Sequence, residues 1–156
     1  MIHNDVMRSI RYILNISDVR IVGIIQLGGL EIDKTHVIAY LKKEDEEGYI
    51  DCPDNVMAHF LDGLIIHKRG RDENHPPPPI ELPIHNNTVL KKLRVTFELR
   101  EEDILAILEQ AGFTTSKPEL SALFRKPDHK NYRRCGDQFL RNFLKGLTLR
   151  LRPDTR

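Results

Sequence analysis

Asp128, His129 and Cys135 are the residues whose types point most directly to chemistry. A thiol next to an imidazole that removes its proton is an arrangement used in nucleophilic catalysis. This interpretation requires an exposed thiol close to the ring. Cys135, however, directly precedes a strongly apolar stretch, where a buried thiol is expected. An enzyme that uses these three residues is therefore the third of our hypotheses.

Four consecutive carboxylates form an acidic cluster, which consists of Glu44, Asp45, Glu46 and Glu47. Carboxylate oxygens are ligands of Mg²⁺ and Ca²⁺, so a divalent-metal site or a site for a cationic partner is one interpretation. Adjacent carboxylates on a helix point in different directions and form a poor cage. The favoured interpretation is a solvated helix end, or a patch that pairs with basic residues of the second half.

The histidines and glycines do not follow the spacing of a known metal or phosphate site. The seven histidines show no His-Glu-x-x-His pattern, and the two cysteines show no Cys-x-x-Cys pattern. A Gly-rich phosphate loop and a Gly-x-Ser-x-Gly elbow are also missing. We therefore expect no metal ion and no cofactor.

A dense basic cluster is the remaining chemical signal. It consists of Arg125, Lys126, Lys130, Arg133, Arg134, Arg141 and Lys145, with His129 and Tyr132 among them. Contact with a phosphate backbone needs such a density of cations, and an aromatic ring can stack on an unpaired base. Against this, the isoelectric point of about 7.8 is lower than that of most dedicated nucleic-acid-binding proteins. Nucleic-acid binding through this cluster is our second hypothesis.

The elements that position these residues occur twice. The stretch from Cys52 to Leu64 returns 83 residues later as the stretch from Cys135 to Leu147. Extending this offset pairs residues 4–69 with residues 87–152 without a gap, and 18 of the 66 pairs are identical. Unrelated sequences of ordinary composition would match at about four positions. The chain therefore contains a tandem duplication.

Each repeat is predicted to contain four short helices, because its apolar residues recur with helical and not with alternating spacing. Asn4 and Asn87 precede the first apolar stripe of each repeat, and we expect them to cap the first helices. Ser17, Asp33 and Ser116 are predicted to begin later helices. Pro127 is predicted to end the third helix of the second repeat by about Arg125, whereas its counterpart in the first repeat has room to extend through Glu47 to Gly48.

Two glycine pairs mark the second and fourth helices. Gly29 and Gly112 are predicted to end the second helices in a left-handed conformation. Gly63 and Gly146 interrupt the strongest apolar stripes, at a cost of about 1 kcal/mol each relative to alanine. We therefore expect close helix approach at these glycines, with the two fourth helices crossing there.

Composition and charge describe an ordinary soluble protein. The chain is 40% apolar and 30% charged, without a run of about 20 apolar residues that could span a membrane and without a signal peptide at its start. We expect a cytoplasmic location and two reduced, packed thiols. Residues 1–86 carry a net charge of −5 and residues 87–156 one of +6. We predict that at least part of the acidic cluster meets the basic cluster.

Three stretches resemble the YehS-like family. They are Leu41-Lys-Lys-Glu-Asp-Glu-Glu-Gly48, Asn86-Asn-Thr-Val-Leu-Lys-Lys-Leu-Arg94 and the segment from Pro127 to Leu140. The resemblance covers nearly the whole chain. It implies a small bacterial, cytoplasmic protein with two copies of a domain of unknown function, and it implies no activity, cofactor or catalytic residue.

The predicted fold is all-α, with two tandem four-helix repeats that are related by an approximate two-fold and share one core. The first repeat spans residues 4–69, a Pro-rich linker spans residues 70–86, and the second repeat spans residues 87–152. The four consecutive prolines after His75 favour an extended spacer. Our first hypothesis for function is a non-enzymatic helical binding module with an unknown protein partner. The oligomeric state stays open.

Overall fold

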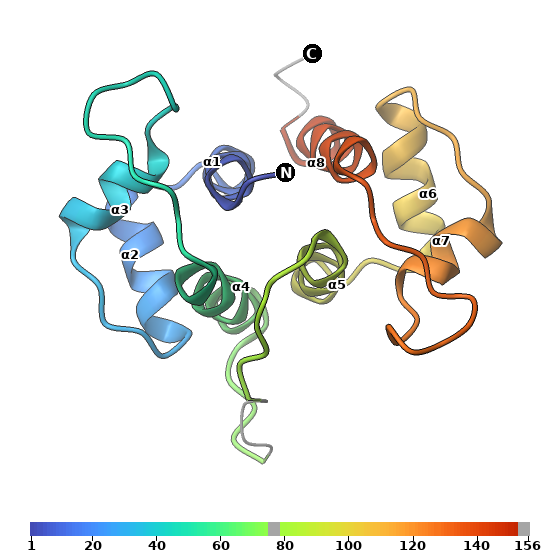
Figure 1. The fold of residues 1–156 in the computed structure, drawn as a ribbon, viewed down its shortest axis with the longest axis horizontal. Coiled ribbons are helices and arrows are strands. Elements are labelled where there is room, and N and C mark those ends of the chain that lie inside the picture. The colour runs from blue at the N-terminus through green and yellow to red at the C-terminus, as the bar shows by residue number, and fades with distance from the viewer. Residues whose placement is uncertain (75–78, 153–156) are drawn as a thin grey trace. The chain divides into compact units, whose positions relative to one another are not determined.

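The computed structural model describes residues 1–74 and 79–152, and this part of the chain contains eight α-helices and no β-strand (Figure 1). The helices are α1 (His3–Leu14), α2 (Asp18–Leu27), α3 (Lys34–Leu41), α4 (Asp54–Arg69), α5 (Asn86–Thr96), α6 (Glu101–Gln110), α7 (Lys117–Leu123) and α8 (Asp137–Leu151). The prediction of an all-α fold with two tandem four-helix repeats is therefore confirmed.

The chain divides into two compact units. Residues 2–84 form one unit, and the residues from His85 onward belong to the other. The predicted shared core and two-fold relation concern the placement of these units, and both remain predictions. The predicted polyproline spacer lies largely outside the described residues.

Each unit buries the apolar stripes that its sequence predicts. In the first unit, the fully buried side chains include Met7, Ile10, Ile21, Ile24, Ile25, Val37, Met57, Phe60, Leu61 and Leu64. In the second unit, they include Leu90, Leu93, Ile104, Ile107, Leu108, Leu120, Leu140, Phe143 and Leu147. Burial of such side chains stabilises each unit by about 1.5–3 kcal/mol per residue.

Local signals set most of the helix boundaries. Ser17, Asp33 and Ser116 each accept a hydrogen bond from the backbone N–H three residues later, at 3.0–3.3 Å, as N-cap side chains do. After α2 and α6, Gly29 and Gly112 adopt φ values of +103° and +80°. These helix starts and stops agree with the predictions.

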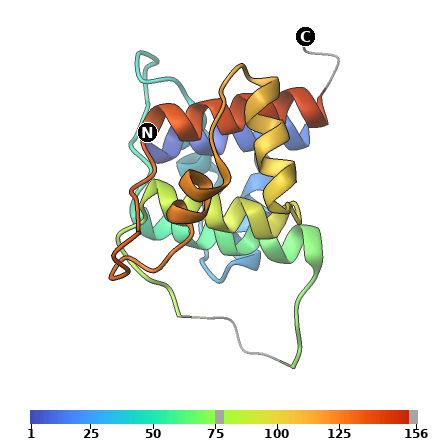
Figure 2. The ribbon, with the colours of Figure 1, turned by 90° about the vertical axis from the view of Figure 1, so that its right-hand side faces the viewer.

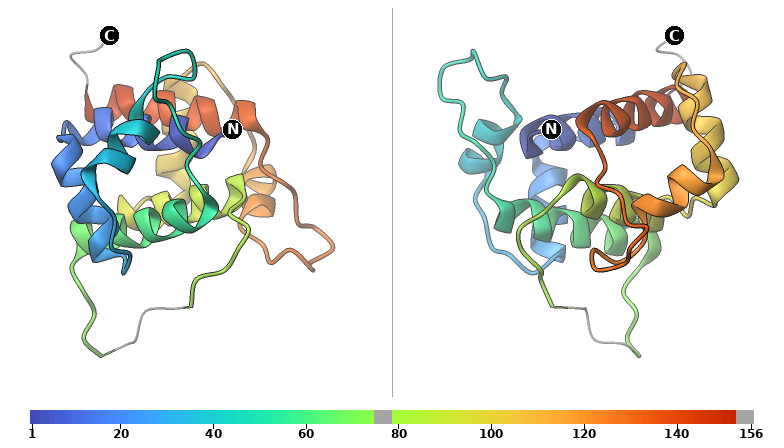
Figure 3. Two further views of the ribbon diagram at one scale, coloured as in Figure 1. Left: turned by 60° about the vertical axis from the view of Figure 1, so that its left-hand side comes forward. Right: turned by 45° about the vertical axis from the view of Figure 1, so that its right-hand side comes forward.

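In each repeat, the second helix packs against the fourth more extensively than any other pair of its helices (Figures 1 and 3). In the second repeat, α6 runs steeply across α8 and α5 (Figure 2). The close approach occurs at the predicted glycines. A Cβ atom on Gly63 would lie 1.8 Å from the carbonyl oxygen of Ile24, and one on Gly146 would lie 2.0 Å from that of Ile107.

The predicted partner of these glycines was wrong. We expected α4 and α8 to cross there, but the space above each glycine is filled by the backbone of α2 or α6 of the same repeat. Apolar spacing shows that a helix face is buried but does not identify the element that buries it. The glycines permit backbone contact within each four-helix unit.

Candidate functional site

Most residues of the acidic and basic clusters lie in two equivalent loops. Each loop connects the third and fourth helices of its repeat. We call residues 42–51 the acidic loop and residues 125–134 the basic loop. Their positions differ by the repeat offset of 83 residues. Counting Lys, Arg, Asp and Glu gives a net charge of −3 for the acidic loop (two cations, five carboxylates) and +4 for the basic loop (five cations, one carboxylate). Duplication therefore produced two similar loops of opposite charge.

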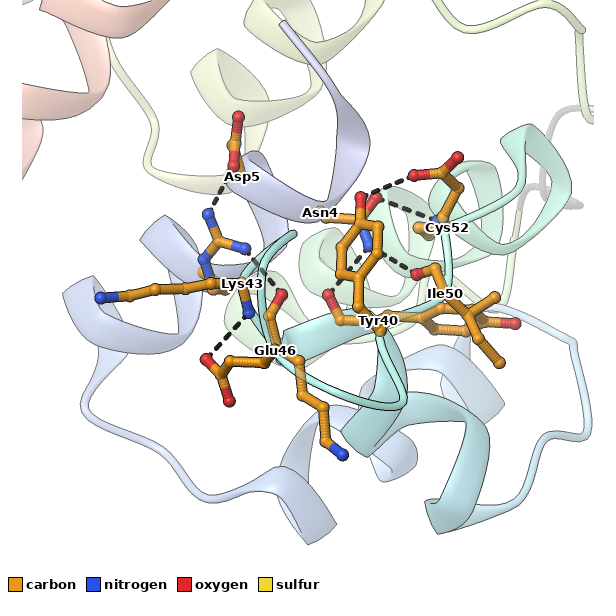
Figure 4. Close-up of polar contacts among 11 residues, drawn as sticks. Asn4, Asp5, Tyr40, Lys43, Glu46, Ile50 and Cys52 are labelled. Atoms are coloured by element: carbon orange, nitrogen blue, oxygen red, sulfur yellow. Dashed lines mark hydrogen bonds and ion pairs between the residues drawn. The ribbon is translucent and has the colours of Figure 1, made fainter.

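Asn4 on α1 holds both ends of the acidic loop (Figure 4). Its side-chain amide donates hydrogen bonds to the carbonyl oxygens of Tyr40 at 3.0 Å and Ile50 at 2.8 Å. Its side-chain oxygen accepts one from the backbone N–H of Cys52 at 2.9 Å. Asn4 is only 1% exposed, so water does not replace these bonds easily.

Asn87 on α5 repeats this arrangement in the second unit. It donates to the carbonyl oxygens of Leu123 at 3.0 Å and Arg133 at 2.9 Å, and it accepts from the N–H of Cys135 at 2.8 Å. Every partner lies 83 residues after its counterpart in the first repeat. We call each set of three hydrogen bonds the asparagine clamp.

The prediction that Asn4 and Asn87 are N-caps was therefore wrong. The N-cap positions belong to Ile2 and His85, and both asparagines lie inside the first turn. An N-cap side chain satisfies one or two N–H groups of its own helix. Each asparagine instead satisfies three backbone groups of a distant loop. The sequence contained a signal for this role, because Asn4 and Cys52 are both identical to their counterparts in the second repeat.

The clamp also explains why α3 ends at Leu41, although the sequence left room for it to extend through Glu47 to Gly48. The carbonyl of Tyr40 accepts from Asn4, and the carbonyl of Ala39 accepts from the N–H of Ile50 at 3.4 Å. Both oxygens would bond to later N–H groups of a longer helix. In the second repeat, Ala122 accepts from the N–H of Arg133 at 3.0 Å in the same way.

The carboxylates Glu44–Glu47 consequently lie in turns, and all four residues are exposed. Inside the acidic loop, the N–H of Lys43 donates to a Glu46 carboxylate oxygen at 3.0 Å (Figure 4). The ammonium group of Lys42 donates to the backbone oxygen of Glu47 at 2.7 Å. Throughout residues 1–74 and 79–152, no group of three or more His, Cys, Asp or Glu side chains is arranged to hold a metal ion.

Cys135 and His129 do not form a catalytic pair with Asp128. Cys135 is 3% exposed, and its thiol contacts the carbonyl oxygen of Gly136 at 3.6 Å. Burial, reinforced by the carboxylate of Asp137, raises the pKa of this thiol to about 12, so it is protonated at neutral pH. The exposed His129 accepts a hydrogen bond from the N–H of Asn131 through Nδ1, at 2.9 Å. The geometry gives the enzyme hypothesis no support.

The basic loop presents its cations to solvent. It projects from the helices of its repeat between α7 and α8 (Figure 3), and Arg125, Lys126, Lys130, Arg133 and Arg134 are all exposed. Arg141 and Lys145 are exposed one turn apart on α8. Among the described residues of this repeat, no carboxylate forms an ion pair with any of the seven. Arg141 interacts electrostatically with the nearby carboxylate of Asp137 without forming an ion pair, and the cluster keeps a large excess of positive charge.

Part of the basic loop forms a shallow depression of about 340 Å³. Its lining residues are Pro118, Glu119, Ala122, Arg125, Lys130, Asn131, Tyr132 and Arg133. The fold thus brings Tyr132 together with three of the predicted cations. A second open depression is lined by Phe124, Arg125, Lys126, Asp128, His129 and Lys130. Arg134, Arg141 and Lys145 line neither one.

Tyr49 and Tyr132 occupy equivalent positions in the two loops but have different surroundings. The hydroxyl of Tyr49 donates to the carboxylate of Asp51 at 2.6 Å, which raises the pKa of Tyr49 to about 12. The residue equivalent to Asp51 is Arg134, and Tyr132 forms no side-chain hydrogen bond with the described part of the chain. The predicted contact of acidic and basic clusters would join the two units, and it stays a prediction.

Comparison with known proteins gives the family of the chain. No helix in residues 1–74 and 79–152 is long and apolar enough to cross a bilayer. The chain matches the family described as "Protein of unknown function (DUF1456)" over residues 3–70 and again over residues 86–152. It is 52% identical over 150 residues to "Uncharacterized protein YehS" of Escherichia coli (strain K12), and the alignment covers 96% of each chain. No solved structure matches it. The chain therefore belongs to the DUF1456 family, whose domain it contains twice, and the predicted YehS-like resemblance is confirmed.

Proposed function

We propose that this protein is a non-enzymatic binding module whose second repeat binds an anionic partner through the basic loop and the adjacent cations of α8. The observation that supports this most strongly is the group of seven exposed cations without an ion pair in their own described repeat. Cations held close together repel one another, and an anionic ligand relieves this repulsion. The proposal needs no buried nucleophile and no metal ion.

The asparagine clamp supports the same proposal. Asn87 binds the carbonyl of Leu123 just before the basic loop and the carbonyl of Arg133 and the N–H of Cys135 at its end, so both ends of the loop are held before any ligand arrives. A loop that is ordered in advance loses less conformational entropy on binding than a free one. The clamp thus makes the loop suitable for recognition.

Nucleic acid is the candidate partner that the composition of this surface favours. Its phosphates match the dense positive charge, and Tyr132 lies among the cations. An acidic protein surface would use the charge but would have no comparable use for a partly exposed ring. Binding to nucleic acid is therefore proposed ahead of binding to an acidic protein.

The test compares two double variants of the full chain with the same net charge. Arg133→Ala with Arg134→Ala removes two cations from the basic loop, and Lys91→Ala with Lys117→Ala removes two exposed cations elsewhere in the repeat. Binding to heparin and to a fluorescent oligonucleotide is measured between about 50 and about 200 mM salt. Thermal unfolding confirms that each variant is folded.

We expect the loop variant to bind at least tenfold more weakly, with a salt slope reduced by about one for each lost phosphate contact. The control variant should retain most of the affinity. Equal losses in the two variants would mean that only net charge matters, and this would overturn the proposal. Failure of the unmodified chain to bind either polyanion at low salt would also overturn it.

A further inference from the structure

We propose that the basic loop recognises single-stranded nucleic acid, with Tyr132 as a stacking surface for one unpaired base. This inference rests on the proposed function and specifies the partner of the same surface. Arg125, Lys130 and Arg133 line the same depression as Tyr132. They are therefore placed to contact the phosphates on either side of a base stacked on the ring.

The difference between Tyr132 and Tyr49 is the observation that carries this inference. Duplication gave both loops a tyrosine at the same position, but the hydroxyl of Tyr49 is bound to Asp51 in an acidic surrounding. Tyr132 is partly exposed and forms no side-chain hydrogen bond with the described residues. Because Tyr132 lines the same depression as Arg125, Lys130 and Arg133, a ligand in that depression meets its ring, and the charge around it attracts a polyanion.

The backbone beneath the ring is well held. The N–H of Tyr132 donates to the carbonyl of His129 at 3.0 Å, and the next residue, Arg133, is bound through both its N–H and its carbonyl. The ring is therefore carried by a fixed backbone. Stacking on a ring of this kind is tolerant of sequence, because every base has a π-face.

The shape of the surface favours a single strand over a duplex. Proteins that read duplex DNA commonly place a helix or a β-ribbon in the major groove. Here the cations lie mainly on a loop of ten residues, and the preceding helix α7 has only seven residues. A stacking ring also needs a base that is not already paired. We therefore expect an unpaired strand to use Tyr132 and a duplex to gain only phosphate contacts.

The test uses the full chain and tyrosine variants at the two equivalent positions. Tyr132→Ala removes the ring, Tyr132→Phe retains the ring without its hydroxyl, and Tyr49→Ala is the matched control in the acidic loop. Each variant is titrated with a single-stranded oligonucleotide, with the duplex of the same sequence and with heparin. The chain contains four tyrosines and no tryptophan, so tyrosine emission reports stacking directly.

We expect Tyr132→Ala to weaken single-strand binding about tenfold or more, with an unchanged salt slope, because the ring carries no charge. Tyr132→Phe and Tyr49→Ala should bind like the unmodified chain. The single strand should quench tyrosine emission in the unmodified chain and in the Tyr49→Ala variant, and the quenching should be lost with Tyr132→Ala. Heparin binding should not depend on Tyr132.

Two results would overturn the inference but leave the proposed function standing. One is single-strand binding that does not change in Tyr132→Ala. The other is binding of heparin or duplex at least as tightly as the single strand, which would indicate a different class of polyanion. A chain that binds none of the three probes at low salt would overturn both proposals.

Discussion

The side-chain oxygen of Asn4 accepts a hydrogen bond from the backbone N–H of Cys52 at 2.9 Å, and Asn87 accepts one from Cys135 at 2.8 Å. Each bond joins residues that are 48 positions apart. The first helix of each repeat is thereby tied to the start of the fourth helix and to both ends of the intervening loop. The clamp survived in both copies, although the loops that it holds acquired opposite charge.

Replacing Asn4 or Asn87 by alanine should destabilise the protein substantially. Three backbone groups would lose a partner, and we expect the free energy of unfolding to fall by about 3 kcal/mol. Urea unfolding measures this change. Asn55 is exposed in the first turn of α4, so Asn55→Ala should alter the free energy by less than about 0.5 kcal/mol. Similar small effects at all three positions would contradict the clamp.

Adding a methyl group at Gly63 or Gly146 should force helices apart. A new Cβ would lie about 2 Å from a carbonyl oxygen of the facing helix, and we expect the free energy of unfolding to fall by about 3 kcal/mol. Gly23 lies within α2, and a Cβ atom added there would meet no atom outside its own helix within 4 Å. Gly23→Ala should therefore stabilise the protein by about 1 kcal/mol. Chemical denaturation of the three variants measures these changes in the free energy of unfolding. A higher free energy of unfolding for Gly63→Ala would refute the close packing.

Glu98 occupies a left-handed backbone conformation with φ of +53°, the same value as the equivalent Asn15 after α1. Asparagine tolerates this conformation better than glutamate. We expect Glu98→Asn to raise the free energy of unfolding by about 0.5–1 kcal/mol and Asn15→Glu to lower it similarly. Circular dichroism should show a higher melting temperature for Glu98→Asn and a lower one for Asn15→Glu. Shifts of both melting temperatures in the same direction would contradict the role of the left-handed backbone conformation.

The two cysteines should make the protein less stable at alkaline pH. Burial, with a smaller contribution from Asp54 or Asp137, raises the pKa of Cys52 and of Cys135 from 9.0 to about 12. Between pH 9 and pH 12 the unfolded chain therefore loses thiol protons that the folded chain keeps. The stabilising contribution is complete below about pH 9 and is lost as the pH rises, by up to about 1.4 kcal/mol per pH unit for each thiol.

A variant with Cys52→Ala and Cys135→Ala isolates this effect. Its free energy of unfolding should fall less steeply between about pH 9 and about pH 12 than that of the unmodified chain, although its stability at neutral pH will be lower because removal of each buried sulfur atom leaves a small cavity. Denaturation at several pH values gives both slopes. Parallel slopes would show that the thiols are ionised as easily in the folded chain as in the unfolded one.

The predicted contact of the acidic and basic loops is testable by neutralising Glu44, Glu46 and Glu47 with glutamine. If the loops pair, this triple variant loses exposed ion pairs worth about 0.2–1 kcal/mol each, and polyanions reach the basic loop more easily. We expect slightly lower stability at low salt and tighter oligonucleotide binding. Glu31→Gln, Glu73→Gln and Glu81→Gln change the net charge equally at exposed sites. Equal effects of the two triple variants would exclude pairing.

The sequence by itself determined the features that depend on local or repeated patterns. The duplication followed from 18 identical pairs, and the helix starts at Ser17, Asp33 and Ser116 followed from side chains that bond to the backbone three residues later. Burial of the two thiols and the stops at Gly29 and Gly112 were also predicted correctly. All of these signals act within a few residues, or are counted along the chain, so no knowledge of distant contacts was needed.

Tertiary structure decided which distant groups meet. Asn4 was predicted to be an N-cap because the sequence around it shows only its own helix. Its actual partners are Tyr40, Ile50 and Cys52, which lie 36 to 48 residues away. For the same reason the sequence did not reveal where α3 ends. The cations of the basic cluster were found from composition alone, but only the fold shows that three of them share a depression with Tyr132. The order of charged residues in the sequence gives the sign of the charge on a surface. The shape of that surface depends on backbone hydrogen bonds between segments that are far apart in the sequence.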